Sequence, residues 1–256
     1  MLRIQRSEGA LIWTIARPEV KNALNEATFR ALSAAVDDAR DDQTVRCVIL
    51  TGEGDAFCAG GDLNEVRDIT SQEATERFAR LGEELCSRLE ALEVPVLAAI
   101  PGVAYGGGAE LALACDMRIA DASARLSFKQ VRMGVTSAWG TVPRLLATVG
   151  TGNAARLLFT AQEISAHEAH ALHLVDTVCQ DGACLSIALG WANDIARGSP
   201  RAVAEMKALL RIARTNPAAV RDEERARFIA TWTAPDHAEA VAAYFQRRAP
   251  RFAPRG

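Results

Sequence analysis

Two glycine-rich stretches follow apolar runs that are typical of buried strands. Residues 55–62 come after the run 46–52, and residues 105–110 come after the run 94–100. Glycine lets the backbone approach a ligand closely and adopt conformations that a Cβ forbids. A backbone N–H from each stretch, one of them at the start of a helix, can converge on a carbonyl oxygen and stabilise the negative charge that develops there. This pattern predicts an enzyme of acyl chemistry.

Glu110 is the candidate acid–base residue. It lies one residue past the second glycine run and opens the apolar segment 110–115, which predicts a buried helix. A carboxylate can also stand at a helix start simply because the helix dipole stabilises it, and here both roles can coincide. A carboxylate in an apolar pocket has a raised pKa, which suits it to take and return protons near neutral pH.

Strands and helices alternate along the part of the chain that must position these residues. Short apolar runs predict strands at residues 2–4, 11–16, 47–50, 94–100 and 117–120. Asn25 is placed to cap a helix whose apolar residues recur at helical spacing, and a second helix is predicted from Phe78 to Leu92. The alternation predicts an α/β fold.

The chain resembles the crotonase superfamily, which is the enoyl-CoA hydratase and isomerase family. The segments that carry the resemblance follow one another in the family's order, at residues 21–25, 56–62, 101–116, 134–135, 144–145, 164–166 and 174–176. The resemblance implies a crotonase-type spiral of β-β-α repeats with a C-terminal helical segment. It also implies an acyl-CoA thioester as the substrate, with no cofactor beyond the coenzyme A that the substrate carries.

The pattern changes near Ser199, which predicts two parts: a spiral core over residues 1–198 and a helical oligomerisation segment over 199–256. Ser199 and Pro200 open one helix, and two more are predicted at 222–232 and 236–247. Short helices without a strand cannot bury their apolar faces alone, so the aromatic residues of this segment require a partner surface. The resemblance implies a homotrimer, or a hexamer built from two trimers.

The resemblance assigns roles to the residues of the glycine stretches and also reveals one departure. The N–H groups of Gly61 and Gly107 would form an oxyanion hole around the thioester oxygen, and Glu110 would move a proton. Hydratases of the family carry a second glutamate at the position of Gln130. An amide cannot exchange a proton as a carboxylate does, although it can orient water. The substitution argues against a two-carboxylate hydration mechanism and predicts weak hydration.

Three functions remain open. The first is an enzyme of enoyl-CoA hydratase/isomerase type, and the second is a decarboxylase of a malonyl-type (methylmalonyl or ethylmalonyl) CoA ester. Residues 134–140 are similar to the corresponding segment of short-chain alkylmalonyl-CoA decarboxylases, which supports the second. The third is a family member that binds acyl-CoA or RNA without catalysis. Glu110 and the two glycine stretches argue against this third function.

The resemblance places the adenine and phosphate ends of coenzyme A along two segments. The residues expected there are Lys21, Ala23, Leu24, Ala59, Gly60, Asp62 and Leu63. For Lys21, a solvated surface lysine is an equal alternative to a phosphate ligand. Tyr105 lies in the segment 101–116 and Trp139 in the segment 134–140 that is similar to the decarboxylases, and both are also expected to contact the substrate.

Composition excludes several other classes of protein. The 256 residues carry a formal net charge of −3 with a pI near 5.9, so nothing draws the chain to nucleic acid or to an anionic membrane. No apolar run approaches the ~20 residues of a membrane span. The charged start, residues 1–8, lacks the apolar stretch of a signal peptide, so we expect a cytoplasmic protein.

Cysteine and histidine spacing gives no sign of a metal site. The six cysteines include no C-x-x-C pair and predict buried, reduced thiols, with Cys58 a small filler of its loop. His167, His170 and His173 lie three residues apart, but they do not form the H-E-x-x-H pattern. The segment 165–168 instead matches a helix capping box.

Overall fold

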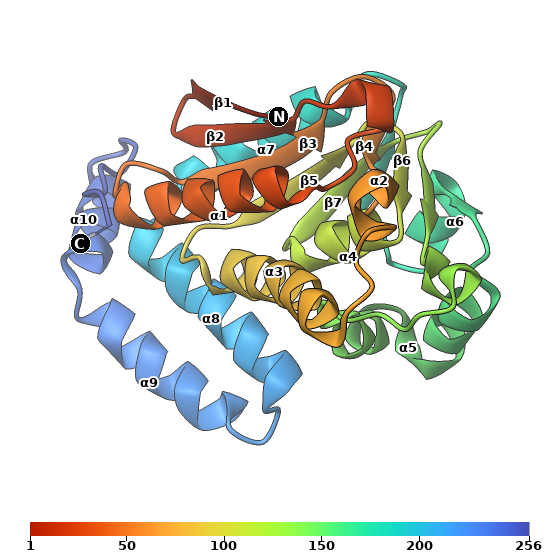
Figure 1. Ribbon diagram of the computed structural model, residues 1–256. Coiled ribbons are helices and arrows are strands. Elements are labelled where there is room, and N and C mark those ends of the chain that lie inside the picture. The colour runs from red at the N-terminus through yellow and green to blue at the C-terminus, as the bar shows by residue number, and fades with distance from the viewer. Residues whose placement is uncertain (256) are drawn as a thin grey trace.

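The computed structural model describes residues 1–255, in which two sheets form the centre of the fold (Figure 1). The larger sheet has the order β1-β2-β3-β5-β7-β10 and consists of β1 (Leu2–Ser7), β2 (Ala10–Ile15), β3 (Cys47–Gly52), β5 (Val96–Ile100), β7 (Met117–Asp121) and β10 (Thr177–Cys179). The smaller sheet has the order β4-β6-β8-β9 and consists of β4 (Ala56–Cys58), β6 (Val103–Tyr105), β8 (Arg125–Ser127) and β9 (Ile164–Ser165). The pairs β1–β2 and β8–β9 are antiparallel, and the others are parallel.

Successive pairs of strands divide between the two sheets. In each of the pairs β3–β4, β5–β6 and β7–β8, the first strand joins the larger sheet and the second joins the smaller one. Helices follow each pair: α2 (Leu63–Val66) and α3 (Gln72–Ala91), then α4 (Gly107–Ala114), then the 3₁₀ helix η2 (Lys129–Met133) and α5 (Thr141–Thr160). This arrangement is a spiral of β-β-α repeats, so the predicted fold class is confirmed.

Helices cover both faces of the larger sheet. The helix α1 (Glu26–Asp41) and α3 lie on one face, and α7 (Cys184–Ala196) lies on the other (Figure 1). Alternate side chains of β3 divide accordingly, because Val48 and Leu50 pack with the α1 and α3 side while Ile49 packs with α7. A strand buried on both faces explains the continuous apolar run in the sequence.

Capping residues begin several helices where the sequence predicts them. The Asn25 side chain accepts a hydrogen bond from the Thr28 N–H at 2.9 Å at the start of α1. Ser165 and Glu168 form a complete capping box at the start of α6 (Ala166–Ala171). Ser199 caps α8 (Pro200–Thr215), which begins at Pro200 as predicted. These predictions succeed because each cap depends only on residues within one turn.

The C-terminal helices differ in how firmly they join the core. The helices α8 and α9 (Val220–Trp232) lie side by side below α1 and α3, and α10 (Pro235–Phe245) lies beside them (Figure 1). The buried Lys207 of α8 donates to the Leu89 and Val94 carbonyl oxygens and pairs with Asp116 at 2.7 Å. Lys207 therefore binds α8 to the core. The domain boundary expected at Ser199 remains a prediction.

Within residues 1–255, no helix is both apolar enough and long enough to cross a bilayer. The cysteines have free thiols, and all of them except the half-buried Cys179 are buried. Burial raises the pKa of the Cys58 thiol to about 12, so it stays protonated at neutral pH. The prediction of buried thiols is therefore confirmed for five of the six cysteines, and the burial of Cys58 agrees with a filler of its loop.

Candidate active site

The two glycine stretches lie side by side because the strands that precede them are neighbours. The strands β4 and β6 pair in parallel, so their carboxyl ends meet at one edge of the smaller sheet. The first stretch, residues 55–62, contains β4, and the second, residues 105–110, begins at the last residue of β6. Neither strand was predicted, because three residues are too few to show an alternating pattern.

The backbones of the two turns touch, which requires glycine at the contact. A Cβ on Gly60 would lie 3.0 Å from the backbone carbonyl oxygen of Tyr105 and 3.1 Å from the backbone nitrogen of Gly107. A Cβ on Gly108 would lie 1.9 Å from the Cys58 oxygen. Gly60 also has a φ of +99°, which disfavours any side chain. The turn after β4 is thereby held directly against the first turn of α4.

The N–H groups of Gly61 and Gly107 remain available to a ligand. A parallel bridge joins Leu24 to the first turn: the Leu24 N–H donates to Gly60 at 2.7 Å, and the Asp62 N–H donates to Leu24 at 2.9 Å. In such a bridge the N–H of the intervening Gly61 points to the opposite side. Among residues 1–255, neither the Gly61 N–H nor the Gly107 N–H donates to a protein acceptor. Their convergence on one oxygen remains a prediction.

Glu110 lies in the first turn of α4 with only 3% of its surface exposed. Burial raises the pKa of its carboxyl group above the ordinary value. A hydrogen bond from the Thr141 hydroxyl to Oε1, at 2.5 Å, opposes this rise. The nearby Gln130 amide, the Arg144 charge and the backbone N–H of Trp139 also lower the pKa of Glu110. The side chain is therefore a buried carboxyl group with a raised pKa, as the sequence predicts.

Gln130 projects from η2 beside this carboxyl group. Its amide is close enough to lower the pKa of Glu110, yet neither its Nε2 nor its Oε1 has a well-aligned hydrogen-bond partner among the described residues. Both atoms are buried. Buried polar groups without partners are uncommon because they lose their hydration and gain nothing in return. The amide of Gln130 is thus suited to bind a water molecule or a polar group of a substrate.

An aromatic cluster of Phe29, Phe78 and Trp139 covers the glycine turns. The Trp139 ring is edge-on to Phe29 at 5.5 Å between centroids and lies 6.2 Å from Phe78. A Cβ on Gly107 would lie 2.4 Å from the Trp139 ring, and a Cβ on Gly61 would lie 2.9 Å from Phe78. A cavity of about 350 Å³ lies beyond Phe78, between α1, α2 and α3. The aromatic rings therefore leave little space directly beside the glycines.

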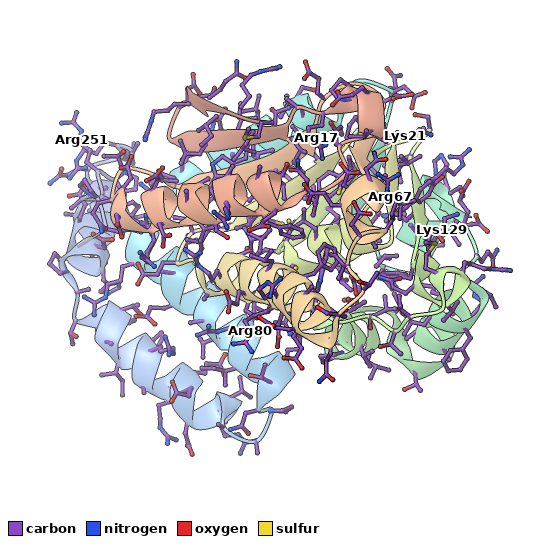
Figure 2. The ribbon with its side chains drawn as sticks, viewed as in Figure 1. Arg17, Lys21, Arg67, Arg80, Lys129 and Arg251 are labelled. Carbon is purple, nitrogen blue, oxygen red and sulfur yellow. The ribbon has the colours of Figure 1, made fainter. Side chains whose placement is uncertain are left out.

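The two segments predicted to bind coenzyme A lie together. The Ala59 N–H donates to the Lys21 oxygen at 2.9 Å, while Ala23 and Leu24 are buried beneath this contact. Figure 2 shows Lys21, Arg17 and Arg67 gathered around α2. Basic side chains thus lie near the loop that follows β4, although Arg17 is paired with Asp62 and Arg67 with Asp68.

Other residues of the predicted site have different surroundings. The buried carboxylate of Asp62 pairs with Arg17 at 2.7 Å and caps α2, so it holds the loop in place. The side chain of Leu63 is exposed. The Tyr105 hydroxyl donates to Glu163 at 2.5 Å, and burial together with this hydrogen bond raises the pKa of Tyr105 to about 12. The hydroxyl of Tyr105 therefore points to Glu163 rather than to Glu110.

The predicted histidine run has an ordinary structural setting. His170 lies in α6, and its Nδ1 is 3.0 Å from the Val175 oxygen. Across residues 1–255, no three His, Cys, Asp or Glu side chains are grouped as a metal site requires.

Known proteins share both the sequence pattern and the fold. Residues 5–255 match the profile of the family described as Enoyl-CoA hydratase/isomerase. The chain belongs to this family. It is 40% identical over 202 residues to a short-chain-enoyl-CoA hydratase of Clostridium acetobutylicum, covering 78% of this chain and 77% of the relative. It is also 40% identical over 178 residues to a crotonyl-CoA hydratase of Syntrophomonas wolfei, covering 69% and 68%.

A solved enoyl-CoA hydratase from Bacillus anthracis superimposes with a TM-score of 0.94 at 30% identity, covering 98% of both chains. The resemblance to the crotonase superfamily is therefore confirmed.

Three polar residues near the site of this enoyl-CoA hydratase/isomerase family member were not predicted from the sequence. Asn22 has a φ of +58°. Its buried amide donates to the backbone carbonyl oxygens of Glu53 and Ala56 at 2.9 and 2.7 Å. Thr141 contacts Glu110, and Arg144 forms two 2.8 Å hydrogen bonds to Glu90. Asparagine tolerates a left-handed backbone conformation, so its presence at position 22 is a signal that the sequence does contain. The other two contacts join distant segments and leave no local pattern.

Proposed function

We propose that this family member acts on short-chain acyl-CoA thioesters through an enolate. In this proposal the N–H groups of Gly61 and Gly107 bind the thioester oxygen, and Glu110 moves the proton at Cα. The observation that carries the proposal is a buried carboxyl group with a raised pKa beside two touching glycine turns, each with an N–H that lacks a protein acceptor.

The arrangement suits enolate chemistry for an electrostatic reason. Loss of a group from Cα leaves an electron pair that spreads into the thioester and places negative charge on its oxygen. Fixed N–H donors stabilise this charge without reorganising, and one such donor contributes about 3–4 kcal/mol. Coenzyme A enters as part of the substrate, so no separate cofactor is required.

The proposed restriction to short acyl groups rests on the aromatic cluster. Trp139 lies against Gly107 and Phe78 lies against Gly61, which limits the room next to the proposed thioester position. The names of the two relatives, a short-chain-enoyl-CoA hydratase and a crotonyl-CoA hydratase, agree with this size of substrate.

Glu110 alone is sufficient for migration of a double bond. Glu110 takes a proton from Cα of a 3-enoyl-CoA, the electron pair shifts through the enolate, and the same proton returns at Cγ. Hydration needs in addition a positioned water and a second proton transfer. In this proposal Gln130 orients the water but exchanges no proton, so hydration is slow, and Gln130→Glu raises it.

A decarboxylase is the second candidate, because the buried Gln130 Nε2 has no acceptor within the described part of the chain. An amide N–H can bind the carboxylate of a malonyl-type CoA ester, whereas a glutamate at that position would repel it. The bond between the carboxyl carbon and Cα breaks, its electrons pass into the enolate, and CO₂ leaves. Protonated Glu110 then donates its proton to Cα of the enolate. The raised pKa of Glu110 favours this protonated form.

Three substrates separate these alternatives. Isomerisation of 3-butenoyl-CoA creates the absorbance of a conjugated thioester, hydration of crotonyl-CoA removes it, and decarboxylation of methylmalonyl-CoA releases CO₂. We expect the first to be fastest, and Glu110→Gln to abolish it. Tight binding of butyryl-CoA without turnover of any of the three would instead support a binding protein that lacks catalysis.

For the assembly we propose a homotrimer or a pair of trimers. The support is the exposed aromatic surface of α9 and α10, which includes Phe228, Trp232, Tyr244 and Phe245. Surfaces of this kind are uncommon on monomers, and identical subunits usually bury them by closed symmetry. Light scattering of the intact chain tests this, and a monomer at micromolar concentration would contradict it. We also propose a cytoplasmic location, which fractionation of cells would test.

A further inference from the structure

Thr141 begins α5, and its side chain lies against Glu110. Only 1% of its surface is exposed, and its hydroxyl donates to Oε1 of Glu110 at 2.5 Å. We propose that Thr141 is a positioning residue that holds Oε1 and thereby presents Oε2 of Glu110 to the substrate. This inference rests on the proposed role of Glu110 in proton transfer.

The turn that carries Thr141 is fixed by an ionic cluster of Glu90, Arg144 and Arg214. Arg144 binds Glu90 through two 2.8 Å hydrogen bonds and donates from Nη1 to the Trp139 carbonyl oxygen. Arg214 of α8 donates to the same Glu90 carboxylate. The turn therefore cannot rotate without breaking buried ionic contacts. A hydroxyl mounted on a fixed turn can restrict a carboxylate to one orientation.

Thr141 is the only hydroxyl group among the side chains that act on Glu110 within the described residues. Arg144 of α5 contributes a positive charge, Gln130 of η2 an amide, and Cys86 of α3 a protonated thiol whose pKa burial raises further. From β6, Tyr105 directs its hydroxyl to Glu163. In the positioning role, the Thr141 donor stabilises the ionised form of Glu110 more than the protonated form, so we expect its removal to raise the pKa of Glu110.

A purely structural role for Thr141 predicts a different result. A buried hydroxyl needs an acceptor wherever it lies, and Oε1 of Glu110 supplies one. If the contact served only this need, Oε1 would accept the hydrogen bond equally well in the ionised and the protonated form of Glu110, so its loss would lower stability without changing how Glu110 titrates. Thr51 offers a matched control, because its buried hydroxyl donates at 2.8 Å to the Ala99 carbonyl oxygen in the larger sheet.

The first test compares the pH–rate profiles of Thr141→Val, Thr141→Ser and Thr51→Val in isomerisation of 3-butenoyl-CoA. A base must be ionised to act, so the rate rises with pH through the pKa of Glu110. We expect Thr141→Val to lower kcat about tenfold, since a hydrogen bond to a charged group is lost, and to move this rise to higher pH. KM should change little. Thr141→Ser should restore both properties, and Thr51→Val should lower the melting temperature alone.

The second test needs no activity. Infrared difference spectra of the substrate-free protein follow ionisation of the Glu110 carboxyl group, assigned by its absence in Glu110→Gln. A higher pKa in Thr141→Val but not in Thr141→Ser would support the inference even if all three substrates fail, in which case only the proposed function falls. A folded Thr141→Val protein with unchanged titration and kcat would overturn it. If that variant does not fold, Thr141→Ala provides the same comparison.

Discussion

The surroundings of Glu110 and the surfaces of α9 and α10 represent opposite situations in one chain. Around Glu110, helices, a turn and an aromatic cluster from distant segments bury the carboxyl group together with Thr141, Trp139 and Phe29. On α10, Tyr244 and Phe245 each expose 78% of their surface. The first region is packed by side chains of this chain, whereas the second presents aromatic rings that are open to solvent. The helix α8 lies between the two, because Lys207 and Arg214 bind it to the core.

Glu110→Gln is expected to have the largest effect, on activity. Loss of a positioned acid–base group slows proton transfer by about 10²–10⁴-fold. The fall in kcat with 3-butenoyl-CoA measures this effect. Retention of more than a tenth of the activity would show that another group moves the proton.

The same Glu110→Gln variant is expected to be more stable than the natural chain at neutral pH. Burial raises the folded-state pKa of Glu110 above 4.5, so its contribution to stability is present below that pH and is lost as pH rises through the folded-state pKa. Glutamine does not ionise and avoids this loss. A gain of 1 kcal/mol would raise the melting temperature by about 2–4 °C at neutral pH and vanish near pH 4. An equal melting temperature at all pH values would contradict the buried charge.

Two truncations separate the core from the assembly surface. We expect a chain that ends at Asn216 to remain folded but monomeric, because it keeps Lys207 and loses the aromatic rings of α9 and α10. A chain that ends at Gly198 should aggregate, because Asp116 and the Leu89 and Val94 carbonyl groups lose their buried partner. Light scattering and thermal unfolding check both. A trimer formed by the 1–216 chain would show that subunits meet elsewhere.

Trp139→Leu tests whether the buried aromatic cluster limits substrate length. The smaller side chain opens space beside Gly107, so the kcat/KM for a 3-octenoyl thioester relative to 3-butenoyl-CoA should rise about tenfold or more. Phe228→Leu on exposed α9 is the matched control and should leave this ratio unchanged. An unchanged ratio in a folded Trp139→Leu protein would place the acyl group elsewhere.

The smallest effect is expected at Glu239, whose carboxyl group behaves oppositely to that of Glu110. Hydrogen bonds from the Arg248 side chain and the Arg251 N–H lower its pKa to about 2. Its contribution to stability is therefore present above the ordinary glutamate pKa and is lost as pH falls through about 2. Because the pair is exposed, salt should weaken it. An NMR titration of Glu239 in low and high salt measures its pKa and the effect of salt on that pKa. An ordinary glutamate pKa would show that the contact with Arg248 does not form in solution.

The sequence was informative wherever a structure depends on neighbouring residues. The caps at Asn25 and Ser199 and the fully buried β3 were predicted because their signals lie within a few positions. The family resemblance added the spiral and the pairing of the two glycine turns. It also identified Gln130 as the departure, and among residues 1–255 the buried amide of Gln130 has no well-aligned hydrogen-bond partner.

What the sequence could not predict depends on contacts between distant positions. Thr141 meets Glu110 across 31 positions, and Arg214 meets Glu90 across 124. Such pairs are set by how helices pack, and neither residue carries a local signal of its partner. The strands β4 and β6 were missed for a different reason, since three residues cannot display a period.

The fit of Trp139 against Gly82 has a consequence for mutational scans. A Cβ on Gly82 would lie 2.0 Å from the indole ring, although this glycine belongs to α3 and contacts no proposed reacting atom. A scan for activity would therefore mark Gly82 as intolerant because of its packing against Trp139, without any contact to a reacting atom. Replacing the indole by a smaller side chain should allow a larger residue at position 82. We therefore expect positions 82 and 139 to co-vary.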